Sequence, residues 1–153
     1  MYSIGTVATL LNISVQTIRL YEQRGLLIIE KSDGNQRKYS QSDIERLECI
    51  RKTINEEKIS IEGIRRIQAM IPCWEHIQCP MEQRTQCPAY LRHDAGCWTY
   101  KHQSNVCSEN NCRDCKIYKH SIDCNNIKSL IRKHQTPQAD MNQTIQTMNN
   151  VIV

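Results

Sequence analysis

The chain has 153 residues, enough for one ordinary domain or two small ones. Its net charge of +4 permits nucleic-acid binding without requiring it. The positions of the charged residues therefore determine whether a nucleic-acid surface is predicted. The N-terminus lacks the charged start and apolar stretch of a secretion signal, and no apolar run reaches membrane-spanning length. We therefore expect a cytoplasmic protein that makes no contact with a membrane and keeps its cysteines reduced.

The composition divides the chain into three parts. Residues 1–72 carry aliphatic side chains at regular intervals and can build a small apolar core. Residues 73–124 hold eight of the nine cysteines and few aliphatic residues, so this segment needs metal or disulfides to stay folded. Residues 125–153 are rich in Asn and Gln, and we expect them to form a flexible tail.

The first elements in chain order are two short helices. Ser3 precedes apolar residues at the spacing of one helix face, which ends at Leu11. After a turn at Asn12, Ser14 can cap a second helix, and Gly25 stands where a helix end favours a left-handed residue. Two short helices joined by a tight turn predict a helix-turn-helix.

A hairpin and two more helices are expected next. Residues 26–31 are apolar and β-branched, the dipeptide Asp33-Gly34 favours a turn, and basic residues follow it. Ser40 and Asp43 form a capping-box pattern for a third helix, with inward residues Ile44, Leu47, Ile50 and Ile54. Ser60 begins a fourth helix, which carries Ile61, Ile64, Ile67 and Ile71 and must end at Pro72.

Residues 2–71 resemble the DNA-binding domain of the MerR family of bacterial regulators. The resemblance rests on Tyr2-Ser3-Ile4-Gly5 with Val7-Ala8, Thr17-Ile18-Arg19-Leu20-Tyr21-Glu22, Arg24-Gly25-Leu26-Leu27, Arg37-Lys38-Tyr39-Ser40 and Asp43-Ile44-Glu45-Arg46-Leu47. It implies a winged helix-turn-helix whose second helix enters the major groove. It further implies a homodimer on palindromic promoter DNA that acts on RNA polymerase by distorting the promoter.

Seven residues are candidates for DNA contact. The resemblance places phosphate or sugar contacts at Arg19 and Tyr21 and wing contacts at Arg37, Lys38 and Tyr39, while Gln16 and Thr17 would read bases. The alternative is that the charged residues form a solvated face and the two tyrosines are core aromatics.

The chain departs from the family where the dimer helix should follow. Members of the family continue into a long helix that forms an antiparallel coiled coil, but Pro72 and Cys73 interrupt it here. Dimerisation would then use residues 73–124, the tail or some other surface, or be absent; of these we expect contacts that involve residues 73–124.

Residues 73–124 contain an imperfect repeat. Each half pairs a Cys-Trp dipeptide with a later Cys-x2-Tyr: first Cys73-Trp74 with Cys87 and Tyr90, then Cys97-Trp98 with Cys115 and Tyr118. The pattern indicates a duplicated binding half.

The cysteines are the candidate metal ligands: Cys73, Cys79, Cys87, Cys97, Cys107, Cys112, Cys115 and Cys124. The spacing Cys107-x4-Cys112-x2-Cys115 reproduces three ligands of a plant-type 2Fe-2S site, with Cys97 or Cys124 as the fourth. A 4Fe-4S cluster, zinc, and disulfide or free-thiol chemistry remain alternatives. We expect Trp74 and Trp98 to pack over the metal, and His76, His93, His102 and His120 to be solvated.

The fold class expected is mainly α: a winged helix-turn-helix followed by a small irregular metal-stabilised domain. The function expected is that of a transcription regulator whose Cys-ligated metal or iron-sulfur cluster senses redox state, oxygen or metal. A zinc-stabilised regulator, a recombination accessory protein and an electron carrier are the alternatives. We do not expect an enzyme. Cys73, Glu75 and His76 include nucleophile, acid and base types, but they are sequence neighbours, whereas catalytic partners usually converge from distant segments.

Overall fold

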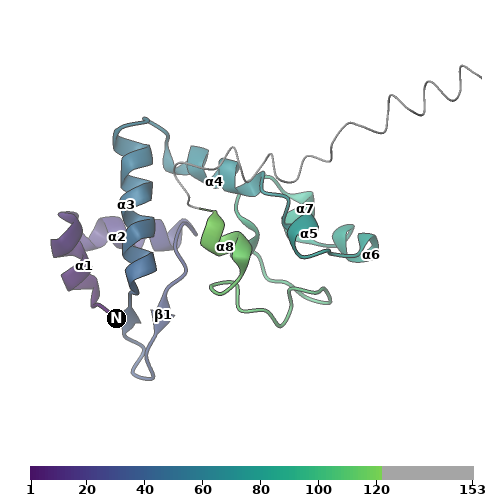
Figure 1. The fold of residues 1–153 in the computed structure, drawn as a ribbon, viewed down its shortest axis with the longest axis horizontal. Helices are drawn as coiled ribbons and strands as arrows, with labels where there is room; N and C mark the ends of the chain where they lie inside the picture. The colour runs from purple at the N-terminus through teal and green to yellow at the C-terminus, as the bar shows by residue number, and fades with distance from the viewer. Residues whose placement is uncertain (122–153) are drawn as a thin grey trace, which may run out of the picture.

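A computed structural model describes residues 1–121 of the chain. The N-terminal part contains α1 (Ile4–Leu11), α2 (Val15–Gln23), β1 (Glu30–Lys31), β2 (Arg37–Lys38), α3 (Gln41–Asn55) and α4 (Ile61–Ala69). The cysteine-rich part contains α5 (Cys73–His76), α6 (Met81–Arg84), α7 (Pro88–Leu91), the 3-10 helix η1 (Cys97–Thr99) and α8 (Lys116–His120). Figure 1 shows α1 to α3 at one end and α5 to α7 at the other, with α4 and α8 between them.

The predicted helix starts are confirmed, because each serine caps the helix that follows it. Ser3 accepts a hydrogen bond from the Thr6 backbone N–H, and Ser14 accepts one from the Thr17 N–H. Ser40 and Asp43 form the reciprocal capping box at the start of α3. Ser60 accepts the Gly63 N–H at the start of α4.

The helix-turn-helix and its wing share one apolar core. Its buried members are Val7, Leu11, Ile18, Tyr21, Leu26, Leu27, Tyr39, Ile44, Leu47, Ile50 and Ile64. Each large apolar side chain buried in this way contributes about 1.5–3 kcal/mol. Among residues 1–121, none beyond Ile64 belongs to this core, so we expect this part of the chain to keep its fold without the cysteine-rich part.

The wing is shorter than predicted. Only Glu30–Lys31 and Arg37–Lys38 pair as antiparallel strands, because Leu26 and Leu27 turn inward and join the core. An isolated bridge between Tyr2 and Tyr39 ties the N-terminus to the wing. The left-handed residue of the turn is Asn35, with φ 58°, rather than Gly34; Asn tolerates this conformation because its short polar side chain can bond locally.

The helix α4 ends at Ala69, so Ile71 lies outside it and Pro72 precedes α5. The longest helix in residues 1–121 is α3 with 15 residues, which agrees with the predicted absence of a long dimer helix from this part of the chain. No helix among these residues is both long and apolar enough to cross a membrane.

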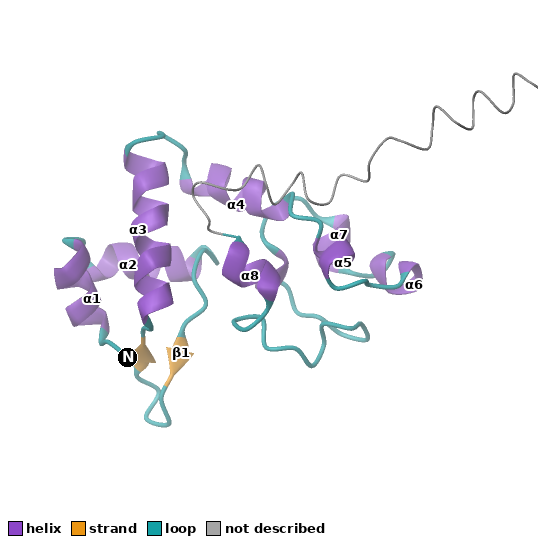
Figure 2. Cartoon of the chain, in the orientation of Figure 1, coloured by secondary structure: helices purple, strands orange, loops and turns teal. Residues whose placement is uncertain are grey.

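Short helices joined by loops make up the cysteine-rich part, as Figure 2 shows. Its core contains Ile71, Cys73, Trp98, Ile117 and Tyr118, with Ile28 of the N-terminal part packed against it. The cysteine-rich part is therefore docked on the segment between α2 and the wing.

Candidate functional site

The exposed face of α2 carries two of the predicted DNA contacts. Gln16 and Arg19 are both exposed on this helix. Thr17 is half-buried, and its hydroxyl lies 2.8 Å from the Ser14 hydroxyl at the helix start. The exposed face of α2 therefore presents the Gln16 amide and the Arg19 guanidinium to a binding partner.

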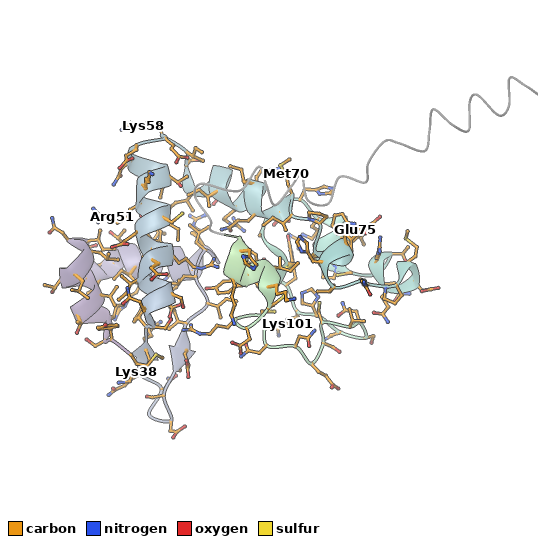
Figure 3. All side chains as sticks on the ribbon, in the orientation of Figure 1. Lys38, Arg51, Lys58, Met70, Glu75 and Lys101 are labelled. Atoms are coloured by element: carbon orange, nitrogen blue, oxygen red, sulfur yellow. The ribbon has the colours of Figure 1, made fainter. Side chains whose placement is uncertain are left out.

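The wing carries the other basic candidates. Arg37 donates from Nε to Glu22 Oε2 at 2.7 Å, and this ion pair fixes the wing against α2. Lys38 is half-buried and lies at the wing end of the molecule in Figure 3. The ion pair raises the pKa of Arg37, so its guanidinium stays charged and holds the hairpin beside the recognition helix.

The two candidate tyrosines lie in the core. Tyr39 has no exposed surface, and its hydroxyl donates to Glu22 Oε1. Tyr21 is 5% exposed and packs in the same core. The prediction that Tyr39 touches DNA is therefore wrong, and the alternative that both rings are core aromatics describes their positions. Burial raises the pKa of each hydroxyl.

Five thiols from both halves of the repeat line one small cavity of about 20 Å³. They belong to Cys73, Cys97, Cys107, Cys112 and Cys115, and we call this space the thiol cavity. The cavity has room for about one water-sized sphere. The structure thus brings together the 107-112-115 triplet and the predicted fourth partner Cys97, and adds Cys73 from the first half.

Two of the predicted metal ligands among residues 1–121 do not line this cavity. Cys79 and Cys87 are buried beside it, and Cys124 lies outside the described residues. Cys49, which lies on the third helix and outside the cysteine-rich part, is half-buried and disulfide-bonded.

Burial and hydrogen bonding shift the pKa values of four of the cavity thiols. Burial raises the pKa of Cys107 to about 12 and raises that of Cys112 as well. A hydrogen bond joins Cys73 and Cys97; it lowers the pKa of the Cys73 thiol and raises that of the Cys97 thiol. Soft thiolates suit zinc and iron-sulfur chemistry, so the donor set fits both expected metals. Among residues 1–121, however, no three Cys, His, Asp or Glu side chains are grouped closely enough to hold a metal ion.

The repeat is visible as two matching ring pairs. Trp74 meets Tyr90 edge-on with ring centroids 4.8 Å apart, and Trp98 meets Tyr118 edge-on at 5.3 Å. In each half a helix begins with the Cys of Cys-Trp, and a second helix follows the Cys of Cys-x2-Tyr. Edge-to-face pairs add about 0.5–1.5 kcal/mol beyond area burial, so each pair stabilises its half.

Three hydrogen bonds join the cysteine-rich part to the chain between α2 and the wing. The Trp98 indole N–H donates to the Gly25 carbonyl at 2.7 Å. The Ile28 backbone N–H donates to the Tyr118 hydroxyl at 2.8 Å, and Arg113 donates to the Ile28 carbonyl at 2.7 Å. Trp98 and Tyr118 therefore contact the DNA-binding part as well as the thiol cavity that they help to line.

Two arginines complete the docking. Arg113 donates to the buried Asp43 carboxylate at 2.5 Å, which is the same carboxylate that caps α3. Arg46 donates to the Tyr118 and Leu26 carbonyls, and its guanidinium lies 3.7 Å from the Tyr118 ring centroid. Burial lowers the pKa of Arg46 to about 10, so it is charged at neutral pH. Sequence reasoning missed both contacts: Arg113 belongs to no motif, and the motif at residues 43–47 that contains Arg46 gives no sign of a contact with the cysteine-rich part.

Comparison with known proteins identifies the N-terminal part. Residues 2–71 match the model of the MerR HTH family regulatory proteins. The transcriptional regulator ZntR of Escherichia coli is 34% identical over 80 residues, 52% of this chain and 56% of that protein. The regulator TnrA of Bacillus subtilis is 49% identical over 45 residues, 29% of this chain and 41% of that one. No solved structure matches the chain.

The chain thus spans about half the length of the curated relatives it matches or less. These two relatives are transcription regulators rather than enzymes, and the family match covers residues 2–71, the DNA-binding part. The capped helices, the turn at Gly25 and the paired wing agree with that match. Residues 2–71 are therefore a helix-turn-helix DNA-binding domain of the MerR family.

Proposed function

We propose that the protein is a promoter-binding transcription regulator in which the state of the thiol cavity controls the DNA-binding domain. The observation that carries the proposal is the position of Trp98. It follows Cys97, a cavity-lining residue, and donates to the carbonyl of Gly25, where the recognition helix α2 ends. Because Trp98 directly follows Cys97, a movement of the Cys97 thiol would be transmitted to the DNA-binding domain through Trp98 alone.

The input is a soft metal held by cysteine thiolates. The five cavity thiols supply the donor type that zinc and iron-sulfur clusters share. Residues 73–121 have few aliphatic side chains, so the binding energy of the metal would also be folding energy for this part. The thiols have to move together before they can act as ligands, and that movement is the step that would pull on Trp98 and Tyr118.

Two identities of the metal compete. The cavity of about 20 Å³ favours a single ion such as zinc, because a polynuclear cluster would need the surrounding loops to open. The spacing of Cys107, Cys112 and Cys115 favours a 2Fe-2S cluster. Protein purified without oxygen separates them: a cluster gives visible absorption with matching iron and sulfide, whereas zinc gives a colourless protein.

On DNA, Gln16 and Thr17 would read bases, while Arg19, Arg37 and Lys38 would contact the backbone. A palindromic site needs two copies of the reader one helical turn apart, so the active form would be a homodimer that acts with RNA polymerase. Its contacts would come from outside the short α4, with residues 73–124 as the expected interface. Sedimentation of the free and DNA-bound protein tests this, and a monomer in both states would remove the palindromic mechanism.

A regulator with a purely structural zinc is the second candidate. Arg46 and Arg113 hold the cysteine-rich part against the DNA-binding domain, and this contact favours the second candidate. A part that only supports the wing would stay in this position whether or not a signal is present. The two candidates differ in one experiment. As metal is removed stepwise, a sensor changes transcription from the bound promoter before residues 73–121 lose their protease resistance, whereas a structural site changes it only together with that loss.

A further inference from the structure

His102 lies between the thiol cavity and a cysteine that does not line it. Its ring lines the cavity, and its Nδ1 atom lies 3.8 Å from the Cys87 sulfur. Because cysteines supply enough metal ligands, we expected this histidine to be solvated in a loop. Its ring is instead half-buried, and hydrogen bonds fix its orientation.

The protonation of the ring follows from its partners. Nε2 lies 2.9 Å from the Cys97 carbonyl oxygen, and a carbonyl can only accept, so Nε2 carries the proton. The Asn105 side chain shows that the other nitrogen, Nδ1, carries no proton and accepts a hydrogen bond. Its oxygen accepts the Cys107 N–H at 2.9 Å, which turns its NH₂ toward Nδ1 at 3.3 Å. Nδ1 therefore presents a lone pair, and the lone pair faces Cys87.

A histidine that binds metal through one nitrogen commonly donates its other N–H to a backbone carbonyl, an arrangement that fixes the ring. His102 has this arrangement without further movement. The separation of Nδ1 and the Cys87 sulfur is also suitable. Zinc bonds of about 2.0–2.1 Å to nitrogen and about 2.3 Å to sulfur, at a tetrahedral angle, place the two ligand atoms about 3.6 Å apart. The observed 3.8 Å lies close to that value.

The repeat supports the same assignment. Cys87 and Cys115 hold equivalent places, each at the start of a helix and each followed by the Tyr that pairs with a Trp. Cys115 faces the thiol cavity, whereas its counterpart Cys87 faces His102. Cys115 thus lies among the other cavity thiols, whereas Cys87 lies against the imidazole that borders the same cavity.

We propose that Cys87 Sγ and His102 Nδ1 bind one divalent soft metal ion of the zinc type. The ion takes the place of the Asn105 amide at Nδ1 and of the proton on the Cys87 thiol. Water, or a cavity thiol that moves toward the ion, fills its remaining positions, because no third Cys, His, Asp or Glu among residues 1–121 stands close enough in this structure. The inference rests on the proposed metal chemistry of the cysteine-rich part, and it adds a nitrogen ligand and a binding place at the border of the thiol cavity.

The test uses reduced, full-length protein titrated with Co²⁺ without oxygen, because Co²⁺ reports tetrahedral sulfur and nitrogen ligands in its visible spectrum. Four variants are compared with the unaltered protein: Cys87→Ser, His102→Gln, the two together, and His93→Gln as a control on an exposed histidine. The amide of Gln at position 102 can still donate to the Cys97 carbonyl but offers no lone-pair nitrogen at the Nδ1 position. Circular dichroism confirms that each variant is folded.

We expect Cys87→Ser and His102→Gln each to lose the same Co²⁺ ion or to bind it at least about 10-fold more weakly. The double variant should lose no further ion, and His93→Gln should match the unaltered protein. A His102→Gln protein that binds Co²⁺ with unchanged stoichiometry, affinity and spectrum overturns the proposal. If Cys112→Ser loses metal in that same comparison, only the histidine assignment has failed. If the unaltered protein binds no metal at all, the proposed function fails with it.

Discussion

The indole N–H of Trp98 donates to the carbonyl of Gly25 at 2.7 Å, which joins the cysteine-rich part to the end of the recognition helix. Gly25 has a φ of 72°, and a Cβ atom at this position would lie 2.5 Å from Thr99 Cγ2. The backbone of the DNA-binding domain thus passes directly against the Cys97–Thr99 turn. A metal that draws in Cys97 has to move this contact or strain it.

Replacing Trp98 with Phe should uncouple the two parts while leaving both folded. The ring pair with Tyr118 survives, but the Gly25 carbonyl loses its donor, which costs about 1 kcal/mol of stability. We expect the DNA affinity of the reader to persist and its dependence on metal to shrink. Anisotropy titrations with metal-loaded and chelator-treated protein measure both. Trp74→Phe is the control, since Trp74 pairs with Tyr90 within the other half; an equal effect of the two variants would contradict the coupling.

Gly25→Ala should destabilise the protein for two separable reasons. The left-handed backbone costs about 1–3 kcal/mol for a residue with a side chain, and the added methyl group collides with Thr99. Thr99→Ser removes the colliding methyl but keeps the hydroxyl that donates to the Gly96 carbonyl. Thermal unfolding of the double variant should therefore recover part of the loss. If Thr99→Ser recovers nothing, the packing of this turn against Gly25 is absent in solution.

Arg113→Met should release the cysteine-rich part from the DNA-binding domain. The change leaves the buried Asp43 carboxylate without its cation and removes the donor to the Ile28 carbonyl, at a cost of about 3 kcal/mol. Limited proteolysis should then cut between residues 73 and 121 while residues 1–71 resist, because their core is separate. Arg92→Met removes the exposed pair with Asp94 and should leave the cleavage pattern unchanged. Equal resistance of both variants would rule out Arg113 as a docking residue.

Arg19→Ala should weaken DNA binding across sequences, since a phosphate contact carries no base information. The slope of log affinity against log salt concentration should fall in magnitude by about one unit for each DNA-binding domain bound. Lys101→Ala, at an exposed position of the cysteine-rich part, is the charge-matched control and should leave the slope unchanged (Figure 3). A slope that Arg19→Ala does not alter would show that this side chain faces away from the DNA backbone.

Local signals accounted for the DNA-binding domain. Serine caps and the apolar spacing predicted α1 to α4 and most of the core because these effects act within one or two turns. The turn at Asp33-Gly34 is confirmed, because the Asn35 N–H donates to the Ser32 carbonyl across it, whereas the left-handed residue that follows at Asn35 was not predicted. Tyr39 was misassigned because a motif fixes a position in the sequence and not the direction of a ring.

The cysteine-rich part could be predicted only in outline. The repeat in the sequence corresponds to the paired rings, and the spacing of Cys112 and Cys115 agrees with their place in one cavity. The sequence did not predict that Cys87 lies outside that cavity. Which cysteines of a loop region come together depends on contacts between residues far apart in the sequence. Docking by Arg46 and Arg113 was missed for the same reason, as each contact spans about 70 residues or more.

The central claim is that the metal state of the thiol cavity controls transcription through the DNA-binding domain. The most direct test is transcription in vitro from a promoter fragment selected by binding from genomic DNA. Protein purified without oxygen is compared with the same protein after chelation and with Cys112→Ser. We expect a change of at least about fivefold between the loaded and chelated forms, and Cys112→Ser fixed at the chelated level. Equal transcription from loaded and chelated protein, both bound to the promoter, would contradict the account.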